Sequence, residues 1–305
     1  MEEQFIKFCK KGYLNEAKEF LRDNPDINIS VLNDLAFRWA CESGHLEVAK
    51  WLLSVKPDIN ISAQNEEAFS YACKNGHLEF AKWLLQMKPD INISANNECA
   101  FQWACSYGHL EVAKWLLQVK PDINISGGGG MSFDDSCENG QLEVAKWLLS
   151  VKPDINISEV VFRWVCYYGH LEVAKWLLSV KPDINISALD EEAFCWACLN
   201  GHLEVAKWLL SVKPDINISA EDDNAFCWSC YEGHVEVSKW LQTLKPYLYV
   251  IEYDENCNYT RFKIRSKEEA NWEKRKYALH LALQEKTNIL YHLPVDIAKT
   301  VTQFV

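Results

Sequence analysis

The 305-residue sequence predicts an all-α repeat solenoid, a stack of helix-turn-helix units, followed by a small α+β block at the C-terminal end. The first observation is a repeated block, Gly-His-Leu-Glu-Val-Ala-Lys-Trp-Leu-Leu, which occurs unchanged at 44–53, 169–178 and 201–210. The second is that the first glycine of this block recurs every 32 residues, with one interval of 29. Such a period is typical of a solenoid, in which each unit buries its apolar face against its neighbours. These glycines are Gly12, Gly44, Gly76, Gly108, Gly140, Gly169, Gly201 and Gly233.

The composition indicates a folded protein of the cell interior. Hydrophobic residues make up 49% of the chain and charged residues 24%, which suits a packed core and excludes disorder. No apolar run approaches the roughly 18 residues that a membrane-spanning helix needs. The N-terminal residues are charged and already follow the repeat, so we do not interpret them as a secretory signal. We therefore expect a soluble cytoplasmic protein.

The cysteines indicate a reducing compartment. Eight of the 12 occupy one position of the repeat. Helices in a stack lie about 8–10 Å apart, whereas a disulfide tolerates about 7 Å between Cα atoms, so these thiols are not expected to pair along the array. We expect small, buried, reduced side chains. They are Cys9, Cys41, Cys73, Cys105, Cys137, Cys166, Cys198 and Cys230.

The formal net charge of −12 restricts the classes of partner. Nucleic acids and anionic membranes both require a basic surface, so neither is expected to bind. An acidic surface favours a basic or neutral protein instead. We expect a monomer that holds no cofactor.

Each unit is predicted to contain two helices and a loop. Ser62, followed three residues later by Asn65, is an N-terminal capping signal for the first helix. That helix ends at Gly76, and His77 begins a second helix. Pro89 stops the second helix, because a proline disfavours helix in the residue before it. The serine signal recurs in later units at Ser187 and Ser219.

The pattern Ala-Phe-x-Trp-Ala-Cys-x-x-Gly-His-Leu-Glu-Val-Ala-Lys-Trp-Leu-Leu resembles the ankyrin repeat, and Lys-Pro-Asp-Ile-Asn is similar to its loop. The family's Thr-Pro-Leu-His turn and finger-loop glycine are absent, so we expect short, irregular fingers instead of β-hairpins. The near-identical, tryptophan-rich units also resemble the ankyrin arrays of giant DNA viruses, which would place the protein in a host cytoplasm. The resemblance covers residues 1–246 as eight units, at about 1–30, 31–62, 63–94, 95–126, 127–158, 159–187, 188–219 and 220–246.

Three repeated features have both a functional and a structural interpretation. The histidine of Gly-His occurs six times, but neighbouring copies lie a repeat apart, too far to share a zinc ion with bonds of about 2 Å. Cys195-x-x-Cys198 and Cys227-x-x-Cys230 resemble a zinc site, yet both pairs fall inside predicted helices. The tryptophans of the second helices suit base stacking, but the acidic charge would repel a phosphate backbone. We favour the structural interpretation for all three and expect no metal.

The fifth and sixth units are predicted to be the weakest. Gly127–Gly130 replace the start of the fifth unit's first helix, at about 1 kcal/mol each relative to alanine. No Lys-Ser/Thr follows these glycines, which argues against a phosphate loop. Asp135 stands where other units have tryptophan, and the sixth unit lacks three residues that we assign to its loop. The weak segment would span 127–162.

The resemblance implies a binding surface rather than an active site. In ankyrin proteins the variable positions of the first helices face the concave groove and bind a protein target. No nucleophile–base–acid set recurs, and His280, His292 and Cys257 in the C-terminal block have no partner at a suitable spacing, so no enzyme is expected. The positions implied for partner binding are Arg38, Glu42, Ser70, Lys74, Gln102, Tyr107, Arg163, Tyr167, Tyr168 and Tyr231, with Ser106, Leu199 and Glu232 varying beside them.

The non-repeating end is predicted to form a β-hairpin at 247–265, a helix at 267–286 and a final amphipathic helix at 293–305. The final segment resembles the start of an F-box, and poxviral ankyrin proteins carry a similar element that recruits a cullin ubiquitin ligase through its adaptor. Two interpretations stay open, a structural cap or a substrate receptor for a ubiquitin ligase. In the second, the adaptor-binding residues would be Leu293, Pro294, Ile297 and Val301.

Overall fold

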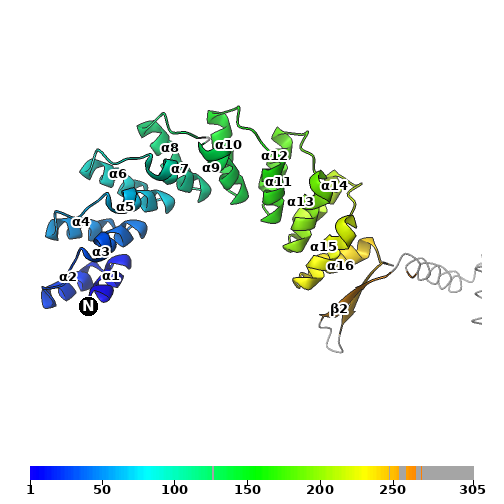
Figure 1. The fold of residues 1–305 in the computed structure, drawn as a ribbon, viewed down its shortest axis with the longest axis horizontal. Coiled ribbons are helices and arrows are strands. Elements are labelled where there is room, and N and C mark those ends of the chain that lie inside the picture. Colours follow the sequence, from blue (N-terminus) through cyan, green and yellow to red (C-terminus); the bar gives the residue numbers. More distant parts are fainter. Residues whose placement is uncertain (126, 247, 254–258, 266–268, 270–305) are drawn as a thin grey trace, which may run out of the picture. The chain divides into compact units, whose positions relative to one another are not determined.

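The computed structural model describes residues 1–125, 127–246, 248–253, 259–265 and 269. These residues form sixteen helices and two strands, which confirms the predicted fold class (Figure 1). Apart from Glu269, the expected helix at 267–286 lies outside the described residues, as does the whole of 293–305.

The helices follow one another in pairs. The first helices of the pairs are α1 (Glu2–Lys10), α3 (Val31–Glu42), α5 (Ala63–Lys74), α7 (Ala95–Ser106), α9 (Gly127–Glu138), α11 (Glu159–Tyr167), α13 (Ala188–Leu199) and α15 (Ala220–Tyr231). The second helices are α2 (Leu14–Asp23), α4 (Leu46–Val55), α6 (Leu78–Met87), α8 (Leu110–Val119), α10 (Leu142–Val151), α12 (Leu171–Val180), α14 (Leu203–Val212) and α16 (Val235–Leu244).

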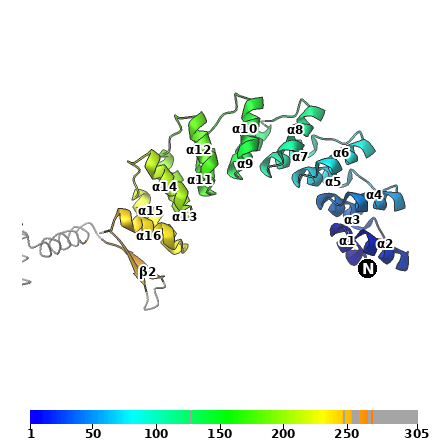
Figure 2. The same cartoon turned by 180° about the vertical axis from the view of Figure 1, so that it is seen from behind.

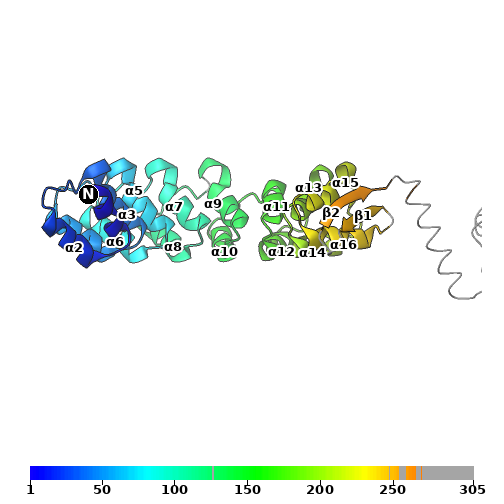
Figure 3. The ribbon, with the colours of Figure 1, turned by 90° about the horizontal axis from the view of Figure 1, so that it is seen from below.

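The chain divides into two compact units, called the first unit and the second unit below; the fifth and sixth units remain the fifth and sixth repeats. The first comprises Met1–Val165 with His170–Ile184, and the second comprises Cys166–Gly169 with Asn185–Val305. Within the first unit, α1, α3, α5, α7 and α9 lie side by side in one layer and the even-numbered helices lie in another (Figures 2 and 3). In the second unit, α13 and α15 pack against each other, with α14 and α16 beside them.

The core repeats with the sequence. Phe69 and Cys73 of α5 and Leu84 of α6 are all at most 1% exposed. The Phe69 ring also contacts Trp115 of the next repeat, with ring centroids 6.2 Å apart. The tryptophans of the second helices therefore pack between repeats, as the structural interpretation predicts. Equivalent contacts at 6.1–6.3 Å join Phe5 to Trp51, Phe101 to Trp147, Phe133 to Trp176 and Phe194 to Trp240.

The eight repeated cysteines are buried free thiols, as predicted. Burial raises the pKa of the Cys9 thiol to about 12, so that thiol stays protonated at neutral pH. Burial likewise raises the pKa of Cys41 and Cys198 well above the usual range. These groups are packing residues rather than nucleophiles, because a reactive cysteine needs an accessible thiolate.

The repeated Gly-His pair joins neighbouring repeats. The Nε2 atom of His77 lies 3.2 Å from the carbonyl oxygen of Glu42, at the end of the preceding α3. The imidazole covers Gly44, where a Cβ atom would come within 2.6 Å of the ring. Gly44 also has a φ of +76°, so both its backbone and its contact require glycine. The histidine binds backbone, as predicted, but that backbone belongs to the neighbouring repeat.

The start of most odd-numbered helices departs from the predicted helix. In α5, Gln64, Asn65 and Glu66 have φ values of 56°, 59° and 65°, which makes three successive left-handed residues before the regular helix begins. The capping prediction is wrong: Ser62, Ser187 and Ser219 make no side-chain cap. Ser62 Oγ instead donates to the Glu66 carboxylate at 2.6 Å. The same left-handed turn occurs at Leu32–Asp34, Asn96–Glu98, Leu189–Glu191 and Glu221–Asp223.

The third residue of each left-handed turn carries a carboxylate, here called the turn carboxylate. Glu66 is only 7% exposed, and its Oε1 accepts the backbone N–H of Asn92 at 3.3 Å. Asp34 accepts from Asn60 N at 3.1 Å, and Glu191 from Asn217 N at 3.2 Å. Left-handed backbone costs about 1–2 kcal/mol per residue. Hydrogen bonds to a charged acceptor contribute about 1.5–3 kcal/mol each, which offsets much of that cost.

The sixth unit lacks this turn. Helix α11 has 9 residues where α5 has 12, and the deleted residues fall between Ser158 and Phe162, not in the loop as expected. Val161 N donates to Ser158 Oγ at 3.3 Å, which is an ordinary helix cap. The boundary between the two compact units falls within this helix.

The fifth unit keeps the length of the turn but loses its carboxylate. Gly128, Gly129 and Gly130 match Asn96, Asn97 and Glu98, whose φ values are 52°, 59° and 64°. The predicted helix-propensity cost of these glycines stays a prediction that depends on right-handed helical backbone, because glycine carries no steric penalty in left-handed backbone. The missing feature is a side chain at Gly130 that would act as Glu98 does.

A hairpin follows α16. Strands β1 (Tyr249–Tyr253) and β2 (Tyr259–Ile264) pair antiparallel, with Tyr249 opposite Ile264. The buried Tyr249 ring stacks on Phe226 of α15 at 4.1 Å between centroids. Its hydroxyl donates to the turn carboxylate of Asp223 at 2.5 Å. Tyr249 thereby replaces two contacts that a further repeat would supply, one to the phenylalanine and one to the carboxylate.

Candidate protein-binding face

Six of the eight odd-numbered helices in the described part of the chain carry an aromatic residue two positions after the buried phenylalanine. Two residues of a helix are about 200° apart, so Trp39 points away from the side on which Phe37 is buried. The equivalent residues in the described part of the chain are Tyr71, Trp103, Trp164, Trp196 and Trp228, with Lys7 in the first repeat and Asp135 in the fifth. We call the surface that these residues share the odd-helix face.

In the first unit this face is ordered by stacking. The rings of Tyr71 and Trp103 are nearly parallel, at 8°, with centroids 5.7 Å apart. The Nζ atom of Lys74 lies 5.1 Å from the Trp103 ring and 5.0 Å from the Tyr107 ring. Lys10 Nζ lies 4.1 Å from Trp39. Cation–π contacts of this kind hold the lysines against the rings.

In the second unit the same face is aromatic without such lysines. Tyr167 meets Trp196 edge-to-face at 5.6 Å and Tyr168 at 5.0 Å. Trp228 meets Tyr231 edge-to-face at 5.6 Å. Tyr168 is 48% exposed, Trp228 45% and Tyr231 74%, so these rings contact one another and still offer surface to a partner.

The comparison with known families now decides the identity. A family model described as ankyrin repeats in three copies matches residues 57–127 and 162–249, more than half of the chain. A single ankyrin-repeat model also matches residues 33–61. The chain belongs to the ankyrin-repeat family. Ankyrin repeats are protein-binding modules, and a search of curated proteins finds no match.

Most of the expected partner-binding residues reach the surface of the ankyrin array at least partly. Tyr107 is the most open of those in the first unit, at 52% exposure. Neighbouring side chains position several of them, as the ring contacts of Lys74 and Tyr167 show. The residues that are exposed or half-buried are Glu42, Lys74, Gln102, Tyr107, Arg163, Tyr167, Tyr168 and Tyr231.

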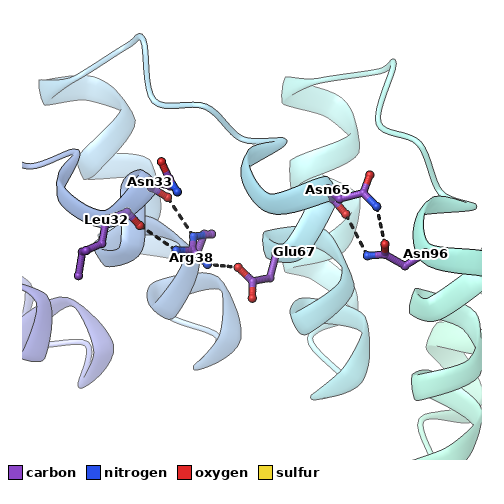
Figure 4. A network of polar contacts seen from close by, with 6 residues as sticks. All are labelled: Leu32, Asn33, Arg38, Asn65, Glu67 and Asn96. Carbon is purple, nitrogen blue, oxygen red and sulfur yellow. Dashed lines mark hydrogen bonds and ion pairs between the residues drawn. The ribbon is translucent and has the colours of Figure 1, made fainter.

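Two expected residues are buried instead. Ser70 is 3% exposed and Arg38 is 9% exposed. The guanidinium of Arg38 donates to the carbonyl oxygens of Leu32 at 2.8 Å and Asn33 at 3.0 Å, and it pairs with Glu67 (Figure 4). Arg38 therefore supports the left-handed turn, and we leave Arg38 and Ser70 out of the candidate face.

Gln102 occupies the position equivalent to Arg38 and acts in a similar way. Its Nε2 donates to the carbonyl oxygen of Asn97 at 2.9 Å, in the left-handed turn at the start of its own helix, α7. Arginine and glutamine at this position thus both donate hydrogen bonds to the carbonyl oxygens of the left-handed turn. A better signal for surface residues was the aromatic position two residues after each buried phenylalanine, which the list of expected contacts omitted.

Helix α9 differs from its neighbours in charge. It carries Asp134, Asp135 and Glu138, none of which is fully exposed. Burial, together with the charge of Asp135, raises the pKa of Asp134 to about 6. Burial also raises the pKa of Asp135 and of Glu138. The pKa values of these three carboxyl groups therefore lie closer to neutral pH than those of ordinary surface acids.

Within the described part of the chain, no group of three or more histidine, cysteine or acidic side chains could hold a metal ion. The two Cys-x-x-Cys pairs lie within helices α13 and α15, and Cys198 and Cys230 are buried there. None of the helices over the same residues is long and apolar enough to cross a membrane.

Proposed function

We propose that this ankyrin protein is a scaffold without chemistry of its own, and that each of its two units binds protein through the odd-helix face. The exposure of Tyr107, Tyr168 and Tyr231 carries this proposal. The residues that recur in every repeat are mostly buried, whereas these tyrosines reach the surface, where a partner could contact them. Tyrosine and tryptophan are favoured anchors at protein interfaces. Rings already held by neighbouring rings lose less freedom when a partner binds.

The even-numbered helices are poorer candidates. They present an ion pair one turn apart in nearly every repeat, such as Glu47–Lys50 at 2.8 Å and Glu172–Lys175 at 2.8 Å. Such exposed pairs stabilise the helix by only tenths of a kcal/mol, but a partner covering them would have to desolvate both charges. Interface cores are accordingly depleted of lysine and glutamate.

The test is a substitution of three tyrosines in the intact chain. We expect Tyr107→Ala, Tyr167→Ala and Tyr168→Ala together to weaken binding of a captured partner about tenfold or more, at an unchanged helical circular-dichroism spectrum. The matched control replaces Val119, Val151 and Val180, exposed residues at the ends of even-numbered helices, by alanine. Equal partner binding by the tyrosine variant and the control would count against the odd-helix face.

The ubiquitin-ligase alternative rests on the sequence of 293–305 alone, because that segment lies outside the described residues. If it binds an adaptor, Ile297→Asp with Val301→Asp should abolish co-purification of the adaptor and leave the repeats folded. Unfolding of the C-terminal block by the same substitutions would favour a structural cap. The described residues do not bear on a viral origin, which stays a hypothesis from the repeat sequence.

A further inference from the structure

The odd-helix face of the second unit carries acids on both α13 and α15. These two helices together contain no lysine or arginine; in the first unit α1 and α5 carry Lys7, Lys10 and Lys74, while α7 and α9 also lack basic residues. Helices α13 and α15 instead carry the exposed acids Asp190, Glu221 and Asp222. Glu232, directly after α15, is exposed as well.

These acids are not required by the fold. Asp190 and Asp222 occupy the middle position of the left-handed turn, where the first unit has Asn33, Asn65 and Asn97. Asparagine is well suited to that backbone conformation. The turn carboxylates are separate residues, the buried Glu191 and the half-buried Asp223 in these two turns.

The other two positions show the same pattern. Glu221 takes the place of Gln64, and Glu232 takes the place of Asn75 and Asn200. At the position of each of these four acids another repeat carries a neutral amide, so the fold does not require the negative charge there.

Apolar surface lies among these charges. Leu189, beside Asp190, is 64% exposed. Trp228 and Tyr231 are exposed on α15, between the turn acids at its start and Glu232 at its end. The ring faces and the carboxylates are both favourable to a cationic side chain, the first through the π-system and the second through charge.

We propose that the odd-helix face of α13 and α15 binds a basic segment of a partner protein, in which arginine or lysine alternates with apolar residues. This proposal rests on the proposed function and adds the chemistry of the partner. Cationic side chains would lie over Trp228 and Tyr231 and pair with the exposed acids, and apolar side chains would contact Leu189. Arginine fits best, because its planar guanidinium stacks on aromatic rings and binds carboxylates in a bidentate manner. Anionic ligands such as nucleic acid are repelled by the same face.

The test uses the full chain and defined probes. One probe is a fluorescein-labelled 15-residue peptide with arginine at every third position and leucine and serine between, and the other has glutamine for each arginine. Fluorescence polarisation should show that the arginine peptide binds at least about tenfold more tightly at low salt, with the difference shrinking as salt screens exposed charges. Equal affinity for the two peptides would overturn the proposal.

The chain offers closely matched variants. Asp190→Asn, Glu221→Gln, Asp222→Asn and Glu232→Asn install residues that other repeats already carry at these positions. This fourfold variant should lose about tenfold in affinity for the arginine peptide, and Trp228→Ala with Tyr231→Ala should lose a similar factor. The control, with Glu143, Glu172, Glu204 and Glu236 of the even-numbered helices changed to glutamine, alters net charge equally and should retain binding.

The outcomes separate this proposal from the proposed function. If the control loses as much affinity as the fourfold variant, the peptide responds to net charge and not to this face, and the proposal fails. If a protein partner is lost on substitution of Tyr107, Tyr167 and Tyr168 but binds the fourfold variant normally, the scaffold function stands and the basic-segment proposal fails. Slower hydrogen exchange at 188–199 and 220–231 with the arginine peptide would support it, and unchanged exchange there would count against it.

Discussion

Removing one turn carboxylate should destabilise the array measurably. Glu66 is buried and accepts hydrogen bonds from Ser62 Oγ at 2.6 Å and from Asn92 N at 3.3 Å. In Glu66→Ala, the half-buried Ser62 hydroxyl can turn to water, but the Asn92 N–H loses a charged acceptor. Hydrogen bonds to charged groups contribute about 1.5–3 kcal/mol each, so we expect a loss of about 2–3 kcal/mol, with the smaller value if water reaches the site.

Two measurements check this loss. Urea denaturation should show a lower midpoint, and the Asn92 amide should exchange roughly 30–150 times faster, the factor that corresponds to about 2–3 kcal/mol. The control is Glu79→Ala on α6, whose exposed carboxylate pairs with Lys82 at 2.7 Å and should contribute less than about 0.5 kcal/mol. An Asn92 amide that exchanges at the same rate in Glu66→Ala and in wild type would refute the role assigned to the carboxylate.

Three further predictions concern the joints of the array. Burial lowers the pKa of His77, His109 and His170, so only the unfolded chain binds these protons as pH falls below about 6.5, and stability should fall there. Replacing all three by glutamine, which Gln141 shows to be compatible with the position, should flatten that fall in urea-midpoint measurements. Asp134→Gln should stabilise the protein at pH 7.5 by about 1 kcal/mol after allowance for solvent screening, and by progressively less as pH falls from about 6 toward 4, because the raised pKa of Asp134 makes its charged form unfavourable in the folded state. Amides at 127–140 should exchange faster than those at 95–108, and Gly130→Glu should slow them; equal rates in wild type would argue against a weak fifth unit.

The stacking of the repeats could be predicted from the sequence because it depends on a fixed period. Each unit places phenylalanine and cysteine on one helix and leucine on the next at the same spacing, and neighbouring units bury them together. The packing of tryptophan between repeats followed from the acidic charge, which made nucleic-acid stacking the weaker interpretation. Buried thiols followed from the distance between stacked helices.

The left-handed turns could not be predicted in the same way. Ser62 with Asn65 and Glu66 is locally indistinguishable from a capping signal, and a run of left-handed residues is unfavourable in isolation. The partner that stabilises the turn, Asn92 N, lies 26 residues after Glu66, so no short window contains both. The sixth unit shows the contrast, since Ser158 forms the predicted kind of cap where the turn is deleted.

The same distinction between local and distant contacts applies to the residues that were expected to bind a partner. Arg38 and Gln102 varied between repeats and were expected to contact a partner, but both donate to carbonyl oxygens of a left-handed turn. Variation at a repeat position indicates a binding role only after the contacts of that position are known. The exposed tyrosines fit a binding role better, because their rings contact neighbouring surface side chains such as Lys74 and Trp228.

Three departures from the repeat occur together in the fifth and sixth units. Gly130 has no turn carboxylate, Gln141 replaces the histidine, and α11 has lost the left-handed turn. Each changes a contact that joins a repeat to its neighbour elsewhere in the chain, and a boundary between the two compact units falls within α11. The residues that change are those of the joints, while the buried Phe133, Phe162 and Cys166 are kept. A sequence that preserves the core of a repeat but alters its joints is expected to weaken the coupling between neighbouring repeats without unfolding either one.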